Sequence, residues 1–411
     1  MSNPPNTPPP PGGGGALRLD PDFKKAYMEN WGNLIPPVPN SAASLRRQNN
    51  TSIRAVMNRL PAPAVAGAGG SSEYGGVHKK EISYTSADGT ELTLHRFQPL
   101  RMPSGRGSSP NNDNPGNHDG GNGTTAEDSK DKANDDNVEG EGGSSEPTTR
   151  HPAVLYLHGG GFLSGSVELF TRDIIRYAVA TGLTFYAPSY RLAPEAPFPK
   201  PLEDVYAALE WLHSHACGEG IDAQRIAVMG HSAGGNLAAA AALTARDRGF
   251  SPGIERLVLV YPMLDDRTRI AGDSPLAEYL TWTGQKNEIA WRAYLDGYAG
   301  MVSSAHQGAS SKGGSKEDVS QYAAPARATD VSRLPKTYLD IGGLDLFRDE
   351  VLTFGARLAA ANVEVEMHLY PGVPHGWEWM TPEIVVTKTA MENRCKALRD
   401  LFVMHADTLW G

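Results

Sequence analysis

Short, nearly continuous apolar runs recur along the chain after residue 152, and segments of helical pattern separate them. Runs of this length suit strands that are buried on both faces of a parallel sheet. They lie at 153–157, 183–187, 225–229, 256–261, 337–341 and 364–370, with helical patterns at about 169–181, 202–215, 233–248, 348–361 and 384–402. Because strands and helices alternate, the sequence predicts a mostly parallel, doubly wound α/β sheet.

The first hundred residues follow another pattern. Residues 1–16 form a Pro/Gly-rich tail with nothing to bury, which predicts disorder. Apolar residues recur at roughly helical spacing over 17–60, and three prolines between residues 36 and 39 divide this stretch into two helices. An Ala/Gly/Pro/Ser linker (61–76) follows. Two strand-like runs, 79–86 and 90–98, flank Asp88-Gly89, which is a hairpin turn signal. The sheet should therefore contain about eight strands.

Two stretches interrupt the regular pattern. Residues 101–150 are rich in Gly, Ser, Asn and acidic residues, and they have almost no large apolar side chain. Ordering such a stretch costs about 1–2 kcal/mol per residue without burial to offset it, so we expect a disordered insertion. Residues 263–332 are partly helical (276–299) and include a flexible loop at 303–317. We expect the α/β core at 77–262 and 333–411, covered by a cap from 17–76 and 263–332.

Charge and composition exclude several classes of protein. The net charge is −9; residues 101–150 contribute −5 of it, and the rest of the chain is close to balance at −4. No Lys/Arg cluster forms the basic footprint that nucleic acid requires. The N-terminus lacks the features of a secretory signal, and no apolar stretch approaches the ~18 residues of a membrane span. Two cysteines cannot form a disulfide framework. We therefore expect a cytoplasmic protein with no nucleic-acid partner and no stable membrane insertion.

The sharpest chemical signal is Gly230-His231-Ser232-Ala233-Gly234, which fits the pattern G-x-S-x-G. A nucleophile elbow of this kind needs small neighbours, because the turn from strand to helix is sharp and strained. The apolar run 225–229 precedes the motif and an Ala-rich helical run follows it. A glycine-rich turn with a chance serine is the alternative, but the strand and the helix favour Ser232 as a nucleophile.

A second motif, His158-Gly159-Gly160-Gly161-Phe162, directly follows the run 153–157. Consecutive glycines let backbone amides approach a substrate closely, and such amides can stabilise a tetrahedral oxyanion. The alternatives are a phosphate-binding loop and plain loop flexibility. The segment has no GxGxxG and no Lys-Ser/Thr after the glycines, which counts against phosphate binding. We expect His158 to be a structural hydrogen-bonding residue.

A serine nucleophile needs a base, and that base needs an acid to orient it. Asp345 and Asp349 follow the run 337–341, and His375 lies in a Pro/Gly loop after the run 364–370. Both segments should reach the carboxyl edge of the sheet, where doubly wound folds place their active sites. We favour Asp345, because Asp349 could instead cap a helix. The other histidines near these elements are expected to be structural or turned away: His231, His368 and His405.

These motifs, in this order, together with Tyr190–Glu195 (YRLAPE), resemble the hormone-sensitive-lipase family of α/β-hydrolases, the family IV carboxylesterases. The resemblance implies Ser232 as nucleophile, Asp345 as acid and His375 as base. It also implies an oxyanion hole made by the amides of Gly160, Gly161 and Ala233, and a helical cap over the pocket. The chain departs from the family in His231 before the nucleophile, in DLF where DPL is common, and in the insertion at 101–150.

The sequence thus predicts a serine carboxylic ester hydrolase of small to medium acyl esters that works through an acyl-enzyme and needs no metal or cofactor. Amide, formamide or lactone hydrolysis on the same triad is one alternative. A non-catalytic relative that binds a small molecule is another, but the presence of His375 counts against it. The expected partner is a small-molecule ester. The last strand (364–370) and the final helix would also allow an edge-to-edge homodimer.

Overall fold

The computed structural model describes residues 16–32, 39–61, 76–100, 150–297 and 319–403. Their centre is one eight-stranded sheet with the strand order β1-β2-β4-β3-β5-β6-β7-β8. The strands are β1 (Val77–Thr85), β2 (Glu91–Pro99), β3 (His151–Leu157), β4 (Thr184–Pro188), β5 (Ile221–His231), β6 (Arg256–Val260), β7 (Lys336–Gly342) and β8 (Val365–Tyr370).

The sheet is parallel from β4 through β3 to β8, and only β1 and β2 run antiparallel to their neighbours. All eight strands coincide with the predicted runs. The central strands β3 and β6 are buried along nearly their whole length, as their continuous apolar sequences require. This sheet confirms the predicted mostly parallel α/β fold.

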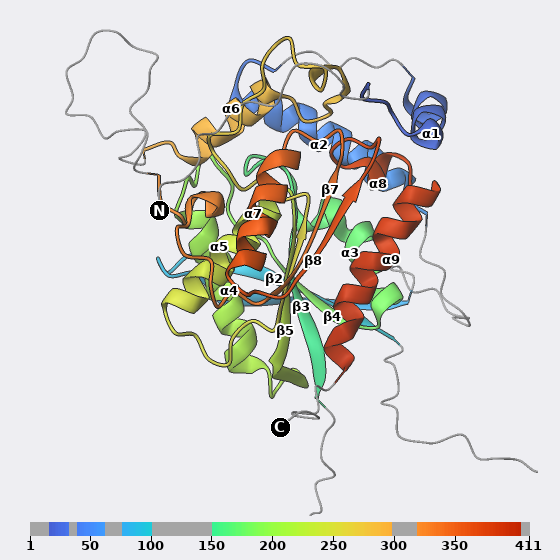
Figure 1. Ribbon diagram of the computed structural model, residues 1–411. Helices are drawn as coiled ribbons and strands as arrows, with labels where there is room; N and C mark the ends of the chain where they lie inside the picture. Colours follow the sequence, from blue (N-terminus) through green and yellow to red (C-terminus); the bar gives the residue numbers. More distant parts are fainter. Residues whose placement is uncertain (1–15, 33–38, 62–75, 101–149, 298–318, 404–411) are drawn as a thin grey trace, which may run out of the picture. The chain divides into compact units, whose positions relative to one another are not determined.

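Helices cover both faces of the sheet (Figure 1). Helices α3 (Val167–Thr181) and α9 (Val385–Arg399) pack together on one side, and α4 (Lys200–His215) and α5 (Ala233–Asp247) pack together on the other, where α7 (Arg348–Ala360) also lies. Residues 233–245 of α5 are all buried, and most of them are Ala or Gly. Small side chains allow this helix to lie close beneath the strand that leads into it.

Three further helices lie together at one end of the sheet in Figure 1: α1 (Pro21–Trp31), α2 (Ala42–Arg59) and α6 (Gly284–Tyr294). Helix α2 packs against α3 and α6, and α1 packs against the short helix α8 (Trp377–Met380). The predicted helix at 276–299 is broken: a 3₁₀ turn at Ala277–Tyr279 precedes α6. The N-cap of α6 is Thr283, whose side chain accepts from the Lys286 amide, so a new helix starts there.

Several expectations concern residues outside the described part of the chain. These are most of the tail, most of the linker, the insertion up to residue 149 and the loop at 303–317. Among the described residues, no helix is both long and apolar enough to cross a lipid bilayer.

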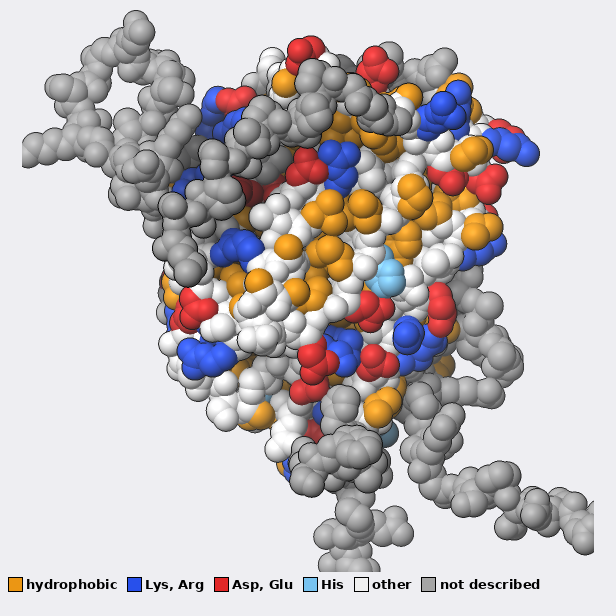
Figure 2. Space-filling model, viewed as in Figure 1, with side chains coloured by type: hydrophobic (Ala, Val, Ile, Leu, Met, Phe, Trp, Pro, Cys, Tyr) orange, Lys and Arg blue, Asp and Glu red, His pale blue; other side chains and the backbone are white. Residues whose placement is uncertain are grey.

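Strand β8 is an edge of the sheet, and it is only partly covered. Leu369 on β8 is 47% exposed and Val385 at the start of α9 is 70% exposed. Figure 2 shows apolar side chains gathered on the face where Figure 1 places α7, β8 and α9.

Candidate active site

Ser232 lies at the turn between β5 and α5, with φ 55° and ψ −117°. A non-glycine residue rarely adopts a positive φ, so the surrounding structure must hold it there. The Ser232 amide donates to the Val260 carbonyl (2.9 Å), and the Ser232 carbonyl accepts from the amides of Asn236 and Met263 (both 3.1 Å). These bonds fix the backbone on both sides of the hydroxyl.

The glycines of the elbow allow backbone segments to approach one another. A Cβ atom on Gly230 would lie 2.1 Å from the Gly234 carbonyl oxygen, and one on Gly234 would lie 2.2 Å from the Leu157 carbonyl oxygen. No side chain fits at such distances. The requirement for small neighbours, inferred from the motif, therefore has a direct steric cause.

The structure brings Ser232, His375 and Asp345 into one hydrogen-bonded line. The Ser232 Oγ atom lies 2.9 Å from His375 Nε2, and His375 Nδ1 lies 2.6 Å from Asp345 Oδ2. The Phe347 amide donates to the other Asp345 oxygen (2.9 Å), and the Asp345 side chain is fully buried. When Nδ1–H donates to the carboxylate, Nε2 is left to accept the serine proton.

Side chains from several elements surround the His375 ring. Tyr261 contacts it edge-on at 4.5 Å between ring centroids, and Phe347 does so at 5.3 Å. Trp282 lies at 6.5 Å, and the Thr281 hydroxyl donates to the His375 carbonyl (2.7 Å). The imidazole is thus held between aromatic rings, which restricts its rotation.

The glycine loop after β3 lies beside the serine. A Cβ added to Gly159 would lie 3.4 Å from Ser232 Cβ, so the backbone of the loop runs close beside the nucleophile. Gly160 and Gly161 have φ values of 134° and 62°, and Gly161 abuts Trp282, whose Cη2 atom would lie 2.4 Å from an added Cβ. Because these three residues have no side chains, the loop presents backbone atoms at this position.

The other candidate residues lie apart from this line. Asp349 forms an ion pair with Arg348, and its side chain is 78% exposed. His368 lies in β8 and bonds Glu366. His158 is buried, contacts its neighbour's carbonyl through Nδ1 (2.9 Å) and stacks on Tyr190. Burial lowers its pKa to about 4. His405 lies outside the described residues.

His231 precedes the nucleophile as the last residue of β5. It is fully buried among Tyr156, Tyr177, Tyr261 and Trp379. Burial first, and then the positive charge of Arg394, hold its pKa well below the usual range. A neutral, enclosed imidazole of this kind cannot exchange protons with a substrate, in agreement with the expectation from the elbow.

A buried ionic cluster lies next to Tyr261, whose ring contacts His375. Arg394 of α9 pairs with Asp340 of β7 and with Glu378 of α8, and all three side chains are fully buried. Tyr261 donates its hydroxyl proton to Glu378 (2.5 Å) while its ring contacts His375. The cluster thus connects three elements of the core to a residue that supports the imidazole.

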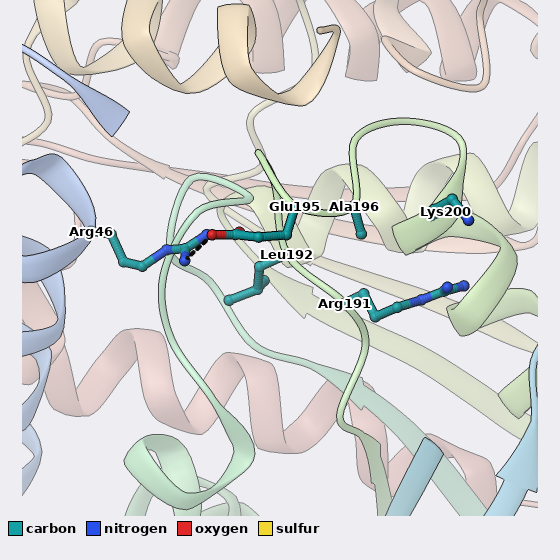
Figure 3. A pocket seen from close by; sticks show the side chains of 6 residues that line it. All are labelled: Arg46, Arg191, Leu192, Glu195, Ala196 and Lys200. Carbon is teal, nitrogen blue, oxygen red and sulfur yellow. Dashed lines mark hydrogen bonds and ion pairs between the residues drawn. The ribbon is translucent and has the colours of Figure 1, made fainter. Parts of the chain in front are cut away.

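A surface pocket of about 420 Å³ lies elsewhere, and none of the three aligned residues lines it. Figure 3 shows its lining: Arg46, Arg191, Leu192, Glu195, Ala196 and Lys200. Its cations already face carboxylates, because Arg46 pairs with Glu195, and both Arg191 and Lys200 pair with Asp88. Across the described parts of the chain, no three His, Cys, Asp or Glu side chains are grouped as metal ligands.

The motifs in the sequence do not predict which residues support His375. Tyr261 ends the predicted run 256–261, and Thr281 lies outside the motifs. Their contacts with His375 come only from tertiary packing. Phe347 had a visible signal, because it occupies a position where the family pattern often has another residue. In the structure, the Phe347 ring contacts the His375 ring edge-on.

Comparisons with known proteins identify the family of the fold. A family profile described as "alpha/beta hydrolase fold" matches residues 154–379, more than half of the chain. Esterase LipI of Mycobacterium tuberculosis is 32% identical over 60% of this chain and 72% of its own length. Carboxylesterase NlhH of the same species is 34% identical over 55% of this chain and 66% of its own length, slightly under two thirds.

Among solved structures, one titled Bacterial Heroin Esterase superposes with a TM-score of 0.68 at 29% identity. That match covers 94% of this chain and 99% of the other. The likeness extends over the sheet and the helices around it. The chain therefore belongs to the alpha/beta hydrolase fold family, in its hormone-sensitive-lipase branch of carboxylesterases.

Proposed function

We propose that this protein hydrolyses carboxylic esters of small to medium acyl groups, with Ser232 as nucleophile, His375 as base and Asp345 as orienting acid. The observation that carries this proposal is the line of three polar groups with separations of 2.9 and 2.6 Å. The proposal is also supported by the similar proteins reported above, which are named as esterases.

In the first half of the reaction, His375 Nε2 takes the Ser232 proton as Oγ attacks the ester carbonyl carbon. The carbonyl oxygen becomes an oxyanion, for which we assign the amides of Gly160, Gly161 and Ala233 as donors. Ala233 is the first residue of α5, where the helix dipole favours negative charge. The tetrahedral intermediate collapses, and the alcohol leaves with the proton from His375.

In the second half, His375 takes a proton from water as the water oxygen attacks the acyl-enzyme. Collapse of the second intermediate releases the carboxylic acid and returns the proton to Ser232. Asp345 keeps its negative charge throughout and stabilises the imidazolium. Trp282 lies against Gly161, so its ring borders the proposed oxyanion hole.

The three helices at the end of the sheet, α1, α2 and α6, are proposed to form the cap expected from the sequence. The Trp31 indole donates to the Met380 carbonyl (3.0 Å), and the α6-adjacent residue Thr281 bonds the His375 backbone. Both contacts tie these helices to the segment that carries the base. The expected homodimer and cytoplasmic location stay predictions, and the solution mass of the protein would test the first.

A fluorophosphonate probe and a substrate panel test the function. We expect the probe to label wild type but not Ser232→Ala, and we expect Ser232→Ala to lose about 10⁶-fold in kcat on p-nitrophenyl butyrate. Turnover of anilides, formamides or lactones, with no turnover of esters, would show that the substrate is one of these classes and not an ester. An unlabelled Ser232 in a folded protein, with no turnover of any of them, would favour a non-catalytic binding protein.

A further inference from the structure

Helix α2 makes a set of polar contacts with the segment that follows the glycine loop. Arg46 Nε donates to the Leu163 carbonyl (2.6 Å), Asn49 Nδ2 donates to Ser164 Oγ (3.2 Å), and the Gly165 amide donates to Asn50 Oδ1 (2.9 Å). Positions 46, 49 and 50 share one face of a helix, because their spacing is i, i+3 and i+4.

Arg46 fixes the helix on the core at the same place. Its guanidinium also bonds the Ala193 carbonyl and pairs with Glu195 (Figure 3). Because Glu195 is mostly exposed, the ion pair itself contributes little, and the bonds to backbone carbonyls carry more of the attachment.

The contact through Asn49 continues into the glycine loop. The Ser164 hydroxyl accepts from Asn49 and donates to the Gly160 carbonyl oxygen (2.6 Å). That carbonyl also accepts from the Ser164 amide (3.1 Å) and the Leu163 amide (3.3 Å). Ser164 is buried, so its hydroxyl has no bulk water to bond instead.

The direction of the Gly160 carbonyl decides the direction of the next amide. The Gly160 carbonyl and the Gly161 N–H belong to one trans peptide plane, where they point in opposite directions. Donors that hold the oxygen on the Ser164 side therefore aim the Gly161 N–H away from Ser164. Glycines at 160 and 161 have little backbone stiffness of their own, so external bonds must supply the orientation.

We propose that Asn49 and Ser164 are positioning residues that connect α2 to the oxyanion hole, by fixing the peptide that carries the Gly161 N–H. This inference rests on the proposed function, in which that N–H stabilises the oxyanion. Preorganised donors act on the transition state, so loss of the orientation lowers kcat and leaves ground-state substrate binding nearly unchanged.

The test uses the full chain with p-nitrophenyl butyrate and a trifluoromethyl ketone, which forms a tetrahedral oxyanion adduct on an active-site serine. Asn49→Ala should lower kcat about 3- to 10-fold, the kinetic equivalent of one neutral hydrogen bond. Ser164→Ala should lower kcat about 10- to 100-fold, below the loss of a whole oxyanion donor. KM should change less than about twofold, and inhibitor affinity should fall in parallel with kcat.

The double variant identifies the route of the effect. If Asn49 acts through Ser164, adding Asn49→Ala to Ser164→Ala should cause no further loss in kcat. Asn58→Ala, an exposed asparagine on the same helix, is the matched control and should retain wild-type kinetics. Thermal unfolding of each variant checks the fold, and Asn49→Ala keeps the test decisive if Ser164→Ala fails to fold.

Three outcomes overturn the inference: wild-type kcat in Asn49→Ala, a rise in KM without loss of kcat, or losses that multiply in the double variant. In each of these cases wild type still turns over esters, so the proposed function survives. If wild type itself neither hydrolyses esters nor reacts with the fluorophosphonate, the proposed function fails instead.

Discussion

Ser232 and His375 bring their reacting atoms within 2.9 Å of each other, but the chain holds the two residues in different ways. The serine side is fixed by backbone: a positive φ, glycines without space for a Cβ, and amide–carbonyl bonds to β6 and α5. The histidine side is fixed by side chains of Tyr261, Phe347 and Thr281, which come from separate loops.

The difference has a consequence for how each side can be damaged. A backbone-held group fails when one atom is added, because the backbone has nowhere to move. A group held by several side chains can lose one support and keep the others, so damage there should be graded. The exception on the histidine side is Asp345, whose buried carboxylate is the only bond partner of Nδ1 among the described residues.

The largest effect should come from Asp345→Asn. An amide at this position can favour the wrong imidazole tautomer and cannot stabilise the imidazolium, so kcat should fall about 10⁴-fold. Ester kinetics measure the loss. Asp349→Asn, which alters the exposed acid four residues later, should retain activity. Equal losses in the two variants would contradict the assignment of the acid.

Gly161→Ala should cost about 10²- to 10³-fold in kcat, because the new methyl group would strike Trp282 and displace the amide. Gly249→Ala is the control, because it introduces the same backbone strain without the clash. Gly249 has nearly the same φ (65° against 62°), but an added Cβ would meet no atom within 4 Å. It should lose about 1–2 kcal/mol of stability and no activity. Full activity in Gly161→Ala would show that the backbone around Ser232 can move to accommodate the added methyl group.

The smallest effect concerns stability and pH. His158 has a folded pKa of about 4 against an ordinary 6.5, because burial disfavours its charged form. Between those values the unfolded chain binds a proton that the folded protein excludes. The free energy of unfolding should therefore decrease as the pH falls, by about 2 kcal/mol between pH 7 and pH 5 from this residue alone.

Urea unfolding at both pH values measures this contribution as a difference between wild type and His158→Gln. The variant should lose about 2 kcal/mol less than wild type on acidification. His78→Gln, which removes an imidazole at an exposed position on β1, is the matched control. Identical pH dependence in wild type and His158→Gln would mean that the buried imidazole accepts a proton without unfolding.

The sequence by itself determined the sheet, the elbow and the order of the chemical groups. Six apolar runs and two strand-like runs became eight strands. The central runs are continuous because a strand buried on both faces can tolerate little else. The motifs G-x-S-x-G and HGGG could be recognised in the sequence because backbone crowding permits only glycine or another small residue at most of those positions. Limits of burial and steric space that act within one segment therefore determine which residues that segment can contain.

Only the tertiary structure decided what surrounds these groups. Tyr261 against His375, Arg394 between Asp340 and Glu378, and Asn49 on Ser164 each join residues more than fifteen positions apart, and most of them more than fifty. The amphipathic spacing of α2 predicted a helix, but the destination of its polar face at 46, 49 and 50 depended on the loop that packs there. A contact between distant segments follows from how the elements pack, and no spacing within one segment encodes it.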